Sequence, residues 1–256
     1  MNDKAVELGL VNTHFETPHG LDSDEHYTTA YELALLSNYA LNNKVFAQIV
    51  GTKEYTITIN NYPKQLSNTN ELLGNFNGVY GIKTGFTNGA NRCLVTACKR
   101  NNIDIICVVL GADTKKFRTQ DSIKLINYIF DNFELVNIED IINKKFETWK
   151  SKNLKNITIN KACSQNIYLN FEDISNKVIP VRKDLIDNIQ VNIECPMYFE
   201  APLASNLKVG SIDISISDFC NFQYSIYNVN EIKRKKSLNY FSELLKNYIS
   251  IVNTFI

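Results

Sequence analysis

The chain has 256 residues, and its 27 Lys and Arg are balanced by 27 Asp and Glu, so its formal net charge is zero. This length is enough for one large or two small domains with hydrophobic cores, and the balanced charge argues against nucleic acid binding driven by overall basicity. A hydrophobic content of 44% with 21% charged residues rules out a wholly disordered chain.

Cysteine and histidine spacing favours neither a zinc site nor a redox motif. The chain has six cysteines and three histidines, and no Cys-x-x-Cys pair is present. We therefore interpret the cysteines as scattered buried thiols, and we expect no metal and no cofactor. The cysteines are Cys93, Cys98, Cys107, Cys163, Cys195 and Cys220.

The first 60 residues predict helices followed by a strand. Residues 1–10 have the pattern of the second half of an amphipathic helix that ends at Gly9. A chain that opens within a helix is predicted to be a mature fragment or a truncated reading frame. Residues 27–50 predict a helix that starts at Thr28 or Thr29, 54–60 alternate as a strand does, and an Asn-rich loop is expected over 60–70.

Three strands and a helix are predicted next, over 78–87, 92–100, 103–110 and 120–133. Asn101-Asn102 fits a two-residue hairpin turn, because asparagine tolerates positive φ. Three sequential strands and a helix predict an antiparallel sheet covered by a helix, an α+β layer.

From residue 137 to 229 the pattern is nearly all alternation, which predicts a small all-β sandwich or barrel with a domain boundary near 137.

The tail predicts an amphipathic helix over 238–256, preceded by a basic cluster at 233–236. This composition is typical of an anchor that lies in the plane of a membrane surface. The alternative is a terminal helix that packs on its own protein or on a partner.

Lys83-Thr84-Gly85 lies on a predicted strand and is the clearest candidate for chemistry. Beside a cleft, the lysine would supply positive charge near a substrate carboxylate, and the threonine hydroxyl would bond that carboxylate. Glycine would let a peptide lie along the strand. Three residues alone are a weak signal.

The surroundings of this triplet strengthen the signal, because residues 1–136 resemble the low-molecular-mass penicillin-binding proteins. These are the serine-type D-alanyl-D-alanine carboxypeptidases of peptidase family S11. Residues 137–256 resemble the family's C-terminal β domain and membrane anchor more weakly. The stretches that carry the resemblance are 7–15, 18–21, 27–34, 68–73, 78–87, 90–100, 108–111, Arg118, Asp121-Ser122 and 125–128.

The resemblance implies an α+β fold in three parts: a partial penicillin-binding or β-lactamase-like domain over 1–136, a small all-β sandwich over 137–229, and a basic cluster with an amphipathic anchor helix over 230–256. It implies substrate-binding roles for Lys83, Thr84, Gly85 and Arg118, where a guanidinium can bond a carboxylate twice. The alternative for Arg118 is a solvated charge at a helix start.

The resemblance also implies a gap. The family's nucleophile motif, Ser-x-x-Lys, and its Ser-x-Asn motif would lie upstream of Met1, so we expect a C-terminal fragment that is inactive alone. Three downstream matches are interpreted as chance, and His19 as structural. The matches are Ser205 with Lys208, Ser151 with Asn153, and Ser164 with Asn166.

The implied function is a hydrolase of cell-wall peptidoglycan, with a role in cell shape, that removes the terminal D-alanine of stem peptides through a serine acyl-enzyme. Expected partners are stem peptides ending in D-Ala-D-Ala, β-lactams, and a membrane surface through 233–256, with no nucleic acid. The expected location is the extracytoplasmic face of the bacterial membrane. The alternative is a non-catalytic membrane-associated module with a decayed cleft.

Overall fold

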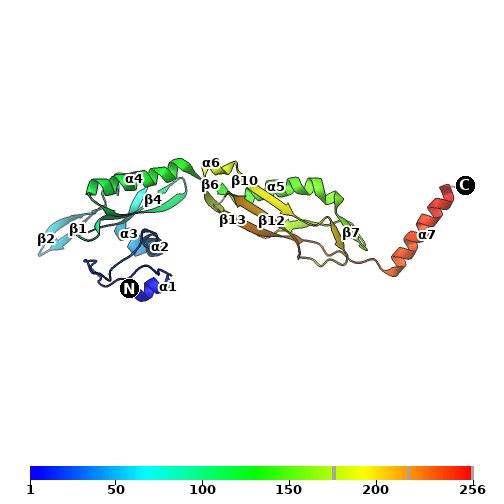
Figure 1. Cartoon of the computed structure of the whole chain (residues 1–256), viewed down its shortest axis with the longest axis horizontal. Coiled ribbons are helices and arrows are strands. Elements are labelled where there is room, and N and C mark those ends of the chain that lie inside the picture. Colours follow the sequence, from blue (N-terminus) through cyan, green and yellow to red (C-terminus); the bar gives the residue numbers. More distant parts are fainter. Residues whose placement is uncertain (175–176, 218–219, 255–256) are drawn as a thin grey trace. The chain divides into compact units, whose positions relative to one another are not determined.

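The computed structural model describes residues 1–174, 177–217 and 220–254. Helices are mixed with sheets that are mainly antiparallel, so the predicted α+β class is confirmed (Figure 1). The chain divides into two compact units, Met1–Glu134 (unit 1) and Leu135–Ile256 (unit 2).

The centre of unit 1 is an antiparallel sheet of β3 (Val79–Thr87), β4 (Asn91–Arg100) and β5 (Ile103–Ala112), in that order. Strand β3 therefore has a free edge. Asn101 and Asn102 join β4 to β5 with φ values of 49° and 65°, which confirms the predicted two-residue turn.

Helices cover both faces of this sheet. Helix α4 (Lys115–Asn132) lies on one face, and α2 (Ala30–Leu41) and α3 (Lys44–Val50) lie on the other (Figure 1). Successive residues of β4 point to opposite faces, so Leu94 packs in the cluster of Ile126 from α4, whereas Ala97 packs in the cluster of Val50 from α3.

Two helices of unit 1 differ from their predicted bounds because side-chain caps set their starts. The single helix predicted over 27–50 is two helices, since Asn43 accepts hydrogen bonds from the backbone N–H groups of Val45 and Phe46 and starts α3. The helix predicted from 120 begins at Lys115, where the Thr114 side chain caps it. The first helix, α1 (Asn2–Glu7), is followed by Gly9 at φ 71° as predicted.

The loop predicted over 60–70 is wrong for its middle part. Residues Glu54–Ile59 form β1 and Tyr62–Ser67 form β2, paired as an antiparallel hairpin. Asn60 and Asn61 make its turn with φ values of 49° and 66°.

Unit 2 is built on a four-stranded antiparallel sheet in the order β10-β12-β13-β8. Two-stranded sheets pair β7 with β11 in parallel and β6 with β9, and the other described elements are a short 3-10 turn and three helices, of which the last is α7 (Ser237–Thr254). Their bounds are β6 (Phe133–Asn137), α5 (Ile138–Asn153), the 3-10 turn (Leu154–Asn156), β7 (Thr158–Asn160), β8 (Leu169–Phe171), β9 (Val178–Arg182), α6 (Lys183–Ile186), β10 (Ile189–Glu194), β11 (Tyr198–Glu200), β12 (Leu207–Ile216) and β13 (Cys220–Asn228).

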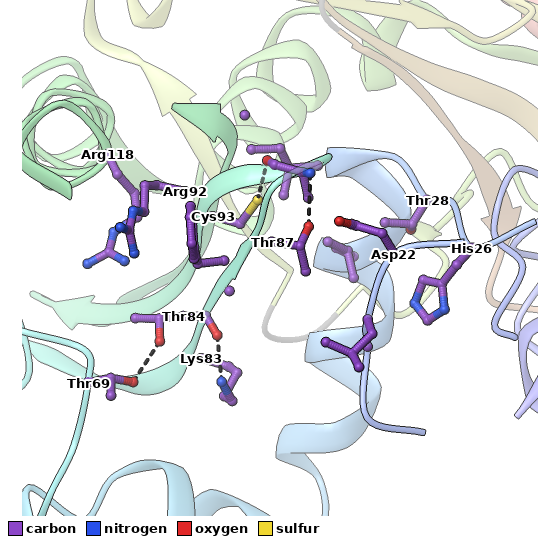
Figure 2. A pocket seen from close by; sticks show the side chains of 18 of the residues that line it. Asp22, His26, Thr28, Thr69, Lys83, Thr84, Thr87, Arg92, Cys93 and Arg118 are labelled. Atoms are coloured by element: carbon purple, nitrogen blue, oxygen red, sulfur yellow. Dashed lines mark hydrogen bonds between the residues drawn. The ribbon is translucent and has the colours of Figure 1, made fainter. Parts of the chain in front are cut away.

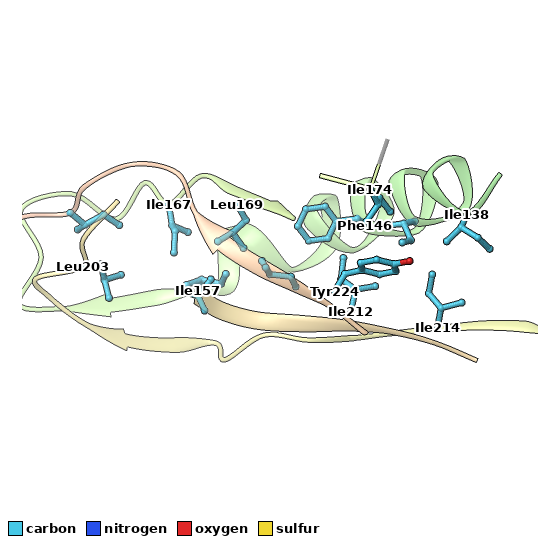
Figure 3. Packing of buried hydrophobic residues seen from close by; sticks show 14 of the residues in the cluster. Ile138, Phe146, Ile157, Ile167, Leu169, Ile174, Leu203, Ile212, Ile214 and Tyr224 are labelled. Atoms are coloured by element: carbon cyan, nitrogen blue, oxygen red, sulfur yellow. The ribbon is translucent and has the colours of Figure 1, made fainter. Parts of the chain in front are cut away.

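The prediction of an all-β domain over 137–229 is wrong, because α5 supplies one side of its core. Ile138, Ile142 and Phe146 are buried and recur at helical spacing. They belong to one cluster with Ile212 and Tyr224 of the sheet (Figure 3). The unit is therefore a helix packed on a sheet.

Residues Ser237–Thr254 form α7, and the predicted helix positions Phe255 and Ile256 lie outside the described residues. Over 1–174, 177–217 and 220–254, no helix is long and apolar enough to cross a membrane. The apolar side chains of α7 that the structure describes are exposed and recur at helical spacing: Phe241, Leu244, Leu245, Tyr248 and Ile249.

Candidate functional site

A cleft of about 1110 Å³ opens in unit 1 at the free edge of β3. Its walls come from the segment 15–33, from 68–71, from β3 and the start of β4, and from the start of α4. Lys83, Thr84, Gly85 and Arg118 all line it, so the structure brings the four predicted substrate-binding residues into one cavity. Figure 2 shows Lys83, Thr84 and Arg118 in this cleft.

The triplet presents a charge and a hydroxyl to this cleft. Lys83 Nζ donates to the carbonyl oxygen of Thr84 at 2.5 Å. The Thr84 and Thr69 hydroxyl oxygens are 2.6 Å apart. One of these two hydroxyls donates to the other, which leaves the second hydroxyl proton for a ligand.

Arg118 is a buried cation with unused hydrogen-bonding capacity. The residue is only 3% exposed, and its Nε and Nη2 atoms have no hydrogen-bond partner in the part of the chain that the structure describes. These two nitrogens form one edge of the guanidinium, the edge that binds a carboxylate through two parallel hydrogen bonds. Burial lowers the pKa of Arg118, but an arginine remains protonated in proteins. The alternative of a solvated charge is therefore wrong.

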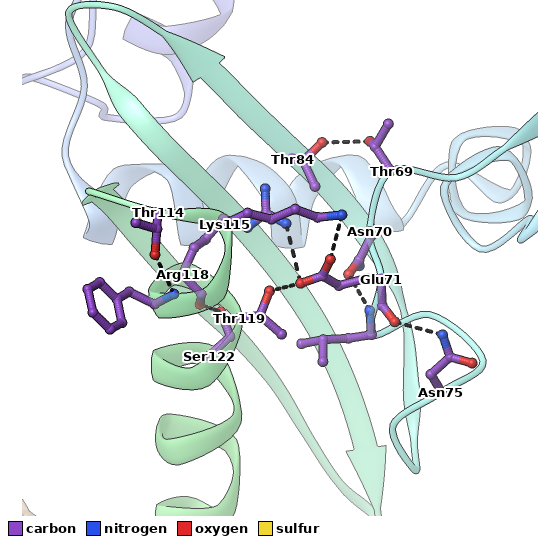
Figure 4. Close-up of polar contacts among 12 residues, drawn as sticks. Thr69, Asn70, Glu71, Asn75, Thr84, Thr114, Lys115, Arg118, Thr119 and Ser122 are labelled. Carbon is purple, nitrogen blue, oxygen red and sulfur yellow. Dashed lines mark hydrogen bonds and ion pairs between the residues drawn. The ribbon is translucent and has the colours of Figure 1, made fainter.

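Glu71 supplies the counter-charge beside Arg118. Its carboxylate accepts a hydrogen bond from the Thr119 hydroxyl and pairs with Lys115 Nζ at 2.7 Å, and Arg118 Nη2 lies 3.9 Å away (Figure 4). Burial acts to raise the pKa of Glu71, but the hydrogen bonds from Lys115 and Thr119 outweigh it, and the pKa is lowered. Glu71 is thus ionised at neutral pH.

Sequence reasoning missed Glu71 and Lys115 as site residues. Thr119 and Glu71 are 48 positions apart, and no local motif joins them. The one sequence signal that could have pointed to Glu71 is its position in the stretch 68–73, which resembles the penicillin-binding family.

The opposite wall of the cleft joins the segment before α2 to the turn between β3 and β4. Asp22 accepts a hydrogen bond from the backbone N–H of Gly89 at 3.1 Å. Hydrogen bonds from the Thr87 side chain and from Gly89 lower the pKa of Asp22. The Arg92 guanidinium lies over the Phe86 ring, 3.5 Å from its centroid.

His19 and the chance motif matches do not add a nucleophilic site in the described residues. His19 lines the cleft, and its Nδ1 accepts the backbone N–H of Leu21 at 3.2 Å, as in a local turn. Ser205 lies in a turn before β12 and not at a helix start, so Lys208 is not placed one helical turn above it. No serine is among the described residues that line the cleft.

Comparison with known proteins identifies relatives for unit 1. Residues 1–114 match the model of the family Peptidase_S11, described as D-alanyl-D-alanine carboxypeptidase. The chain is 39% identical over 135 residues to D-alanyl-D-alanine carboxypeptidase DacF of Bacillus subtilis, covering 52% of this chain and 35% of that protein. It is 41% identical over 137 residues to DacC of Escherichia coli, covering 53% and 34%. The chain thus spans about a third of the length of these relatives.

Solved structures match a larger part of the chain. Penicillin-binding protein 5 of Haemophilus influenzae superposes with a TM-score of 0.59 and 25% identity, covering 91% of this chain and 64% of that chain. Penicillin-binding protein 6B of Escherichia coli gives the same TM-score and identity, covering 89% and 57%. Together the comparisons show that residues 1–136 are similar to S11 D-alanyl-D-alanine carboxypeptidases, the family that the resemblance named.

Proposed function

We propose that the cleft of unit 1 is the carboxylate-binding side of a D-alanyl-D-alanine carboxypeptidase site, and that it binds the end of a peptidoglycan stem peptide. The observation that carries the proposal is that Arg118 lines the same cleft as Lys83, Thr84 and Gly85, while its buried Nε and Nη2 atoms have no hydrogen-bond partner among the described residues. The names of the matched relatives support the choice of substrate.

Each residue has a separate part in holding a terminal carboxylate. Arg118 would donate two parallel hydrogen bonds to its oxygens. The hydroxyl pair of Thr69 and Thr84 would donate a third. Lys83 would add positive charge, and β3, as an edge strand of its sheet, offers an edge along which an extended peptide could pair.

In the reaction implied by the resemblance, a serine attacks the carbonyl carbon of the peptide bond before the terminal D-alanine. An acyl-enzyme forms as D-alanine leaves, and water then hydrolyses the acyl-enzyme. In β-lactam binding a penicillin would take the place of the peptide. Because no serine lines the described cleft, the proposal for this chain concerns binding and orientation of the peptide end.

Calorimetric titration of the full chain with two ligands tests the proposal. N-acetyl-D-alanyl-D-alanine should bind at least tenfold more tightly than its C-terminal amide, because only the free acid can use the Arg118 edge. Equal binding of acid and amide, or binding of neither, contradicts the proposal.

We further propose that α7 places the chain on a membrane surface, outside the cytoplasm as expected for a cell-wall enzyme. The apolar side chains of Phe241, Leu244 and Tyr248 are exposed on α7, and the basic cluster 233–236 precedes it. A helix with an apolar face and adjacent cations binds anionic bilayers in the plane of the surface.

Co-sedimentation with phosphatidylglycerol vesicles tests this membrane proposal. The affinity of the double variant Leu244→Asn and Leu245→Asn for vesicles should fall at least tenfold. Each leucine side chain that enters the bilayer contributes about 1.5–3 kcal/mol to binding, and asparagine does not. The matched control is Leu207→Asn, an exposed leucine of β12, which should bind as the unmodified chain does. Unchanged binding of the double variant would favour a helix that packs on protein.

A further inference from the structure

The anion-binding end of the cleft holds more positive charge than one carboxylate needs. Lys115, Arg118 and Arg92 all line it, and Arg92 is close enough to Arg118 to act on the pKa of Arg118. Lys83 lines the same cleft, and four cations around one cavity would favour a ligand with two negative charges over a ligand with one. Glu71 is the carboxylate that lies among them.

Glu71 is held where it acts through charge without occupying the Arg118 edge. The Lys115 ammonium and the Thr119 hydroxyl both bond to its carboxylate (Figure 4). At 3.9 Å from Nη2, the carboxylate oxygen is too far for a hydrogen bond but close enough for a strong Coulombic interaction. The lowered pKa of Glu71 means that this charge is present at neutral pH.

We propose that Glu71 is a specificity-determining residue that restricts the site to peptides with one negative charge at their end. The inference rests on the proposed function and names the substrate class more narrowly. The terminal carboxylate of a ligand gains two charged hydrogen bonds from Arg118, which exceed its repulsion by Glu71. A second carboxylate, on the last side chain, gains no such bonds and is repelled by Glu71. The substrate therefore ends in a residue with an uncharged side chain.

The experiment measures a ratio of affinities on the full chain by calorimetry. The ligands are N-acetyl-D-alanyl-D-alanine, with one carboxylate, and N-acetyl-D-alanyl-D-aspartate, with two. The variant is Glu71→Gln, which keeps the size of the side chain and an acceptor for Thr119. The matched control is Glu54→Gln, an exposed glutamate of β1 that bonds to Gln65 away from the cleft.

In Glu71→Gln, the affinity for the two-carboxylate ligand relative to the one-carboxylate ligand should rise about tenfold, and the rise should shrink at high salt. Glu54→Gln should leave the ratio unchanged. If Glu71 had a purely structural role, Glu71→Gln would lower the affinities for both ligands equally and leave their ratio unchanged. That result would contradict the inference.

Failure of the inference and failure of the proposed function give different results. If the one-carboxylate ligand binds more tightly than its amide but the ratio does not respond to Glu71→Gln, the specificity role is wrong and the proposed function stands. If the one-carboxylate ligand binds no more tightly than its amide to any of the three proteins, both are wrong.

Discussion

Arg118, the residue proposed to bind the ligand carboxylate, has little electrostatic compensation for its burial in the described structure. Burying a guanidinium with two nitrogens that lack a partner among the described residues costs desolvation free energy, and the ion pair with Glu71 at 3.9 Å offsets this cost only in part. Such a cost is expected where a residue is kept for a ligand and not for the fold.

Arg118→Met should therefore separate stability from binding. We expect the melting temperature of unit 1 to stay the same or rise, because methionine fills the space without a buried charge. The affinity for N-acetyl-D-alanyl-D-alanine should fall at least 30-fold, corresponding to about 2 kcal/mol for lost charged hydrogen bonds. Arg182→Met, on an exposed arginine of unit 2, is the control for both measurements. Retained affinity in Arg118→Met would show that the ligand uses other groups.

The cysteines provide a pH-dependent test of burial at the residue scale. All six are free; Cys163 is exposed, whereas Cys107 is buried in the core of unit 1. Burial raises the pKa of Cys107 to about 11, and only the thiolate reacts with iodoacetamide. At pH 8 Cys163 should label first, and labelling of Cys107 should speed up as the pH rises toward 11. If Cys107 and Cys163 of the folded chain were labelled at the same rate at pH 8, and that rate matched the rate in denaturant, Cys107 would not be buried.

At this scale, the resemblance and the triplet pointed to Lys83, Thr84 and Arg118, because their residue types have a recognisable use. Glu71 could not be predicted in the same way. Its role depends on contacts with Lys115 and Thr119 that exist only after α4 packs beside the segment 68–71.

Two hairpins of unit 1 use the same turn chemistry, and only one was predicted. Asn101-Asn102 lies between two apolar strands, which made the hairpin visible in the sequence. Asn60-Asn61 has the same positive φ values, but every residue of β2 (Tyr62–Ser67) is exposed. A strand with no buried face has no hydrophobic period to detect.

The left-handed turn residues give a stability prediction at the element scale. Asn101→Ala and Asn102→Ala should each lower the free energy of unfolding of unit 1 by about 1 kcal/mol, because alanine disfavours positive φ. Asn38→Ala, at an exposed position inside α2, should be neutral or stabilising, since alanine favours a helix. Urea denaturation followed by circular dichroism measures all three variants. No loss at either turn position would contradict the strained φ values.

Helix α5 explains the main error at the element scale. The period-2 alternation that predicts strands begins only after residue 156. The prediction of strands was wrongly applied from residue 137 onward, although residues 138–153 do not alternate. Ile138, Ile142 and Phe146 instead follow a period near four, which is a helical signal. The sheet and this helix need each other to bury their apolar faces, so unit 2 is α+β as well.

At the scale of the whole molecule, the two units differ in how their cores are built. Unit 2 has one continuous cluster that runs in sequence from Val136 to Ile232. Unit 1 has separate clusters on the two faces of its sheet, and it exposes Tyr31, Val45 and Ile49 on α2 and α3.

Limited proteolysis should therefore leave unit 2 as the more resistant part. We expect trypsin to cut first within residues 1–134 and to leave a fragment that covers roughly 135–232, identified by mass spectrometry. Heating should show two transitions, with that of unit 1 at the lower temperature. Recovery of residues 1–134 as the surviving fragment would contradict this order of stability.

The central claim is that the Nε and Nη2 edge of Arg118 receives a peptide carboxylate. The most direct measurement is the Nε–H signal of Arg118 in ¹H–¹⁵N spectra, assigned by its absence in Arg118→Met. On addition of N-acetyl-D-alanyl-D-alanine, this proton should move downfield in a saturable way and exchange more slowly with water, as expected for a new charged hydrogen bond. The C-terminal amide should leave it in place. An unmoved Arg118 signal, while other residues of the cleft respond to the free acid, would show that the carboxylate binds elsewhere.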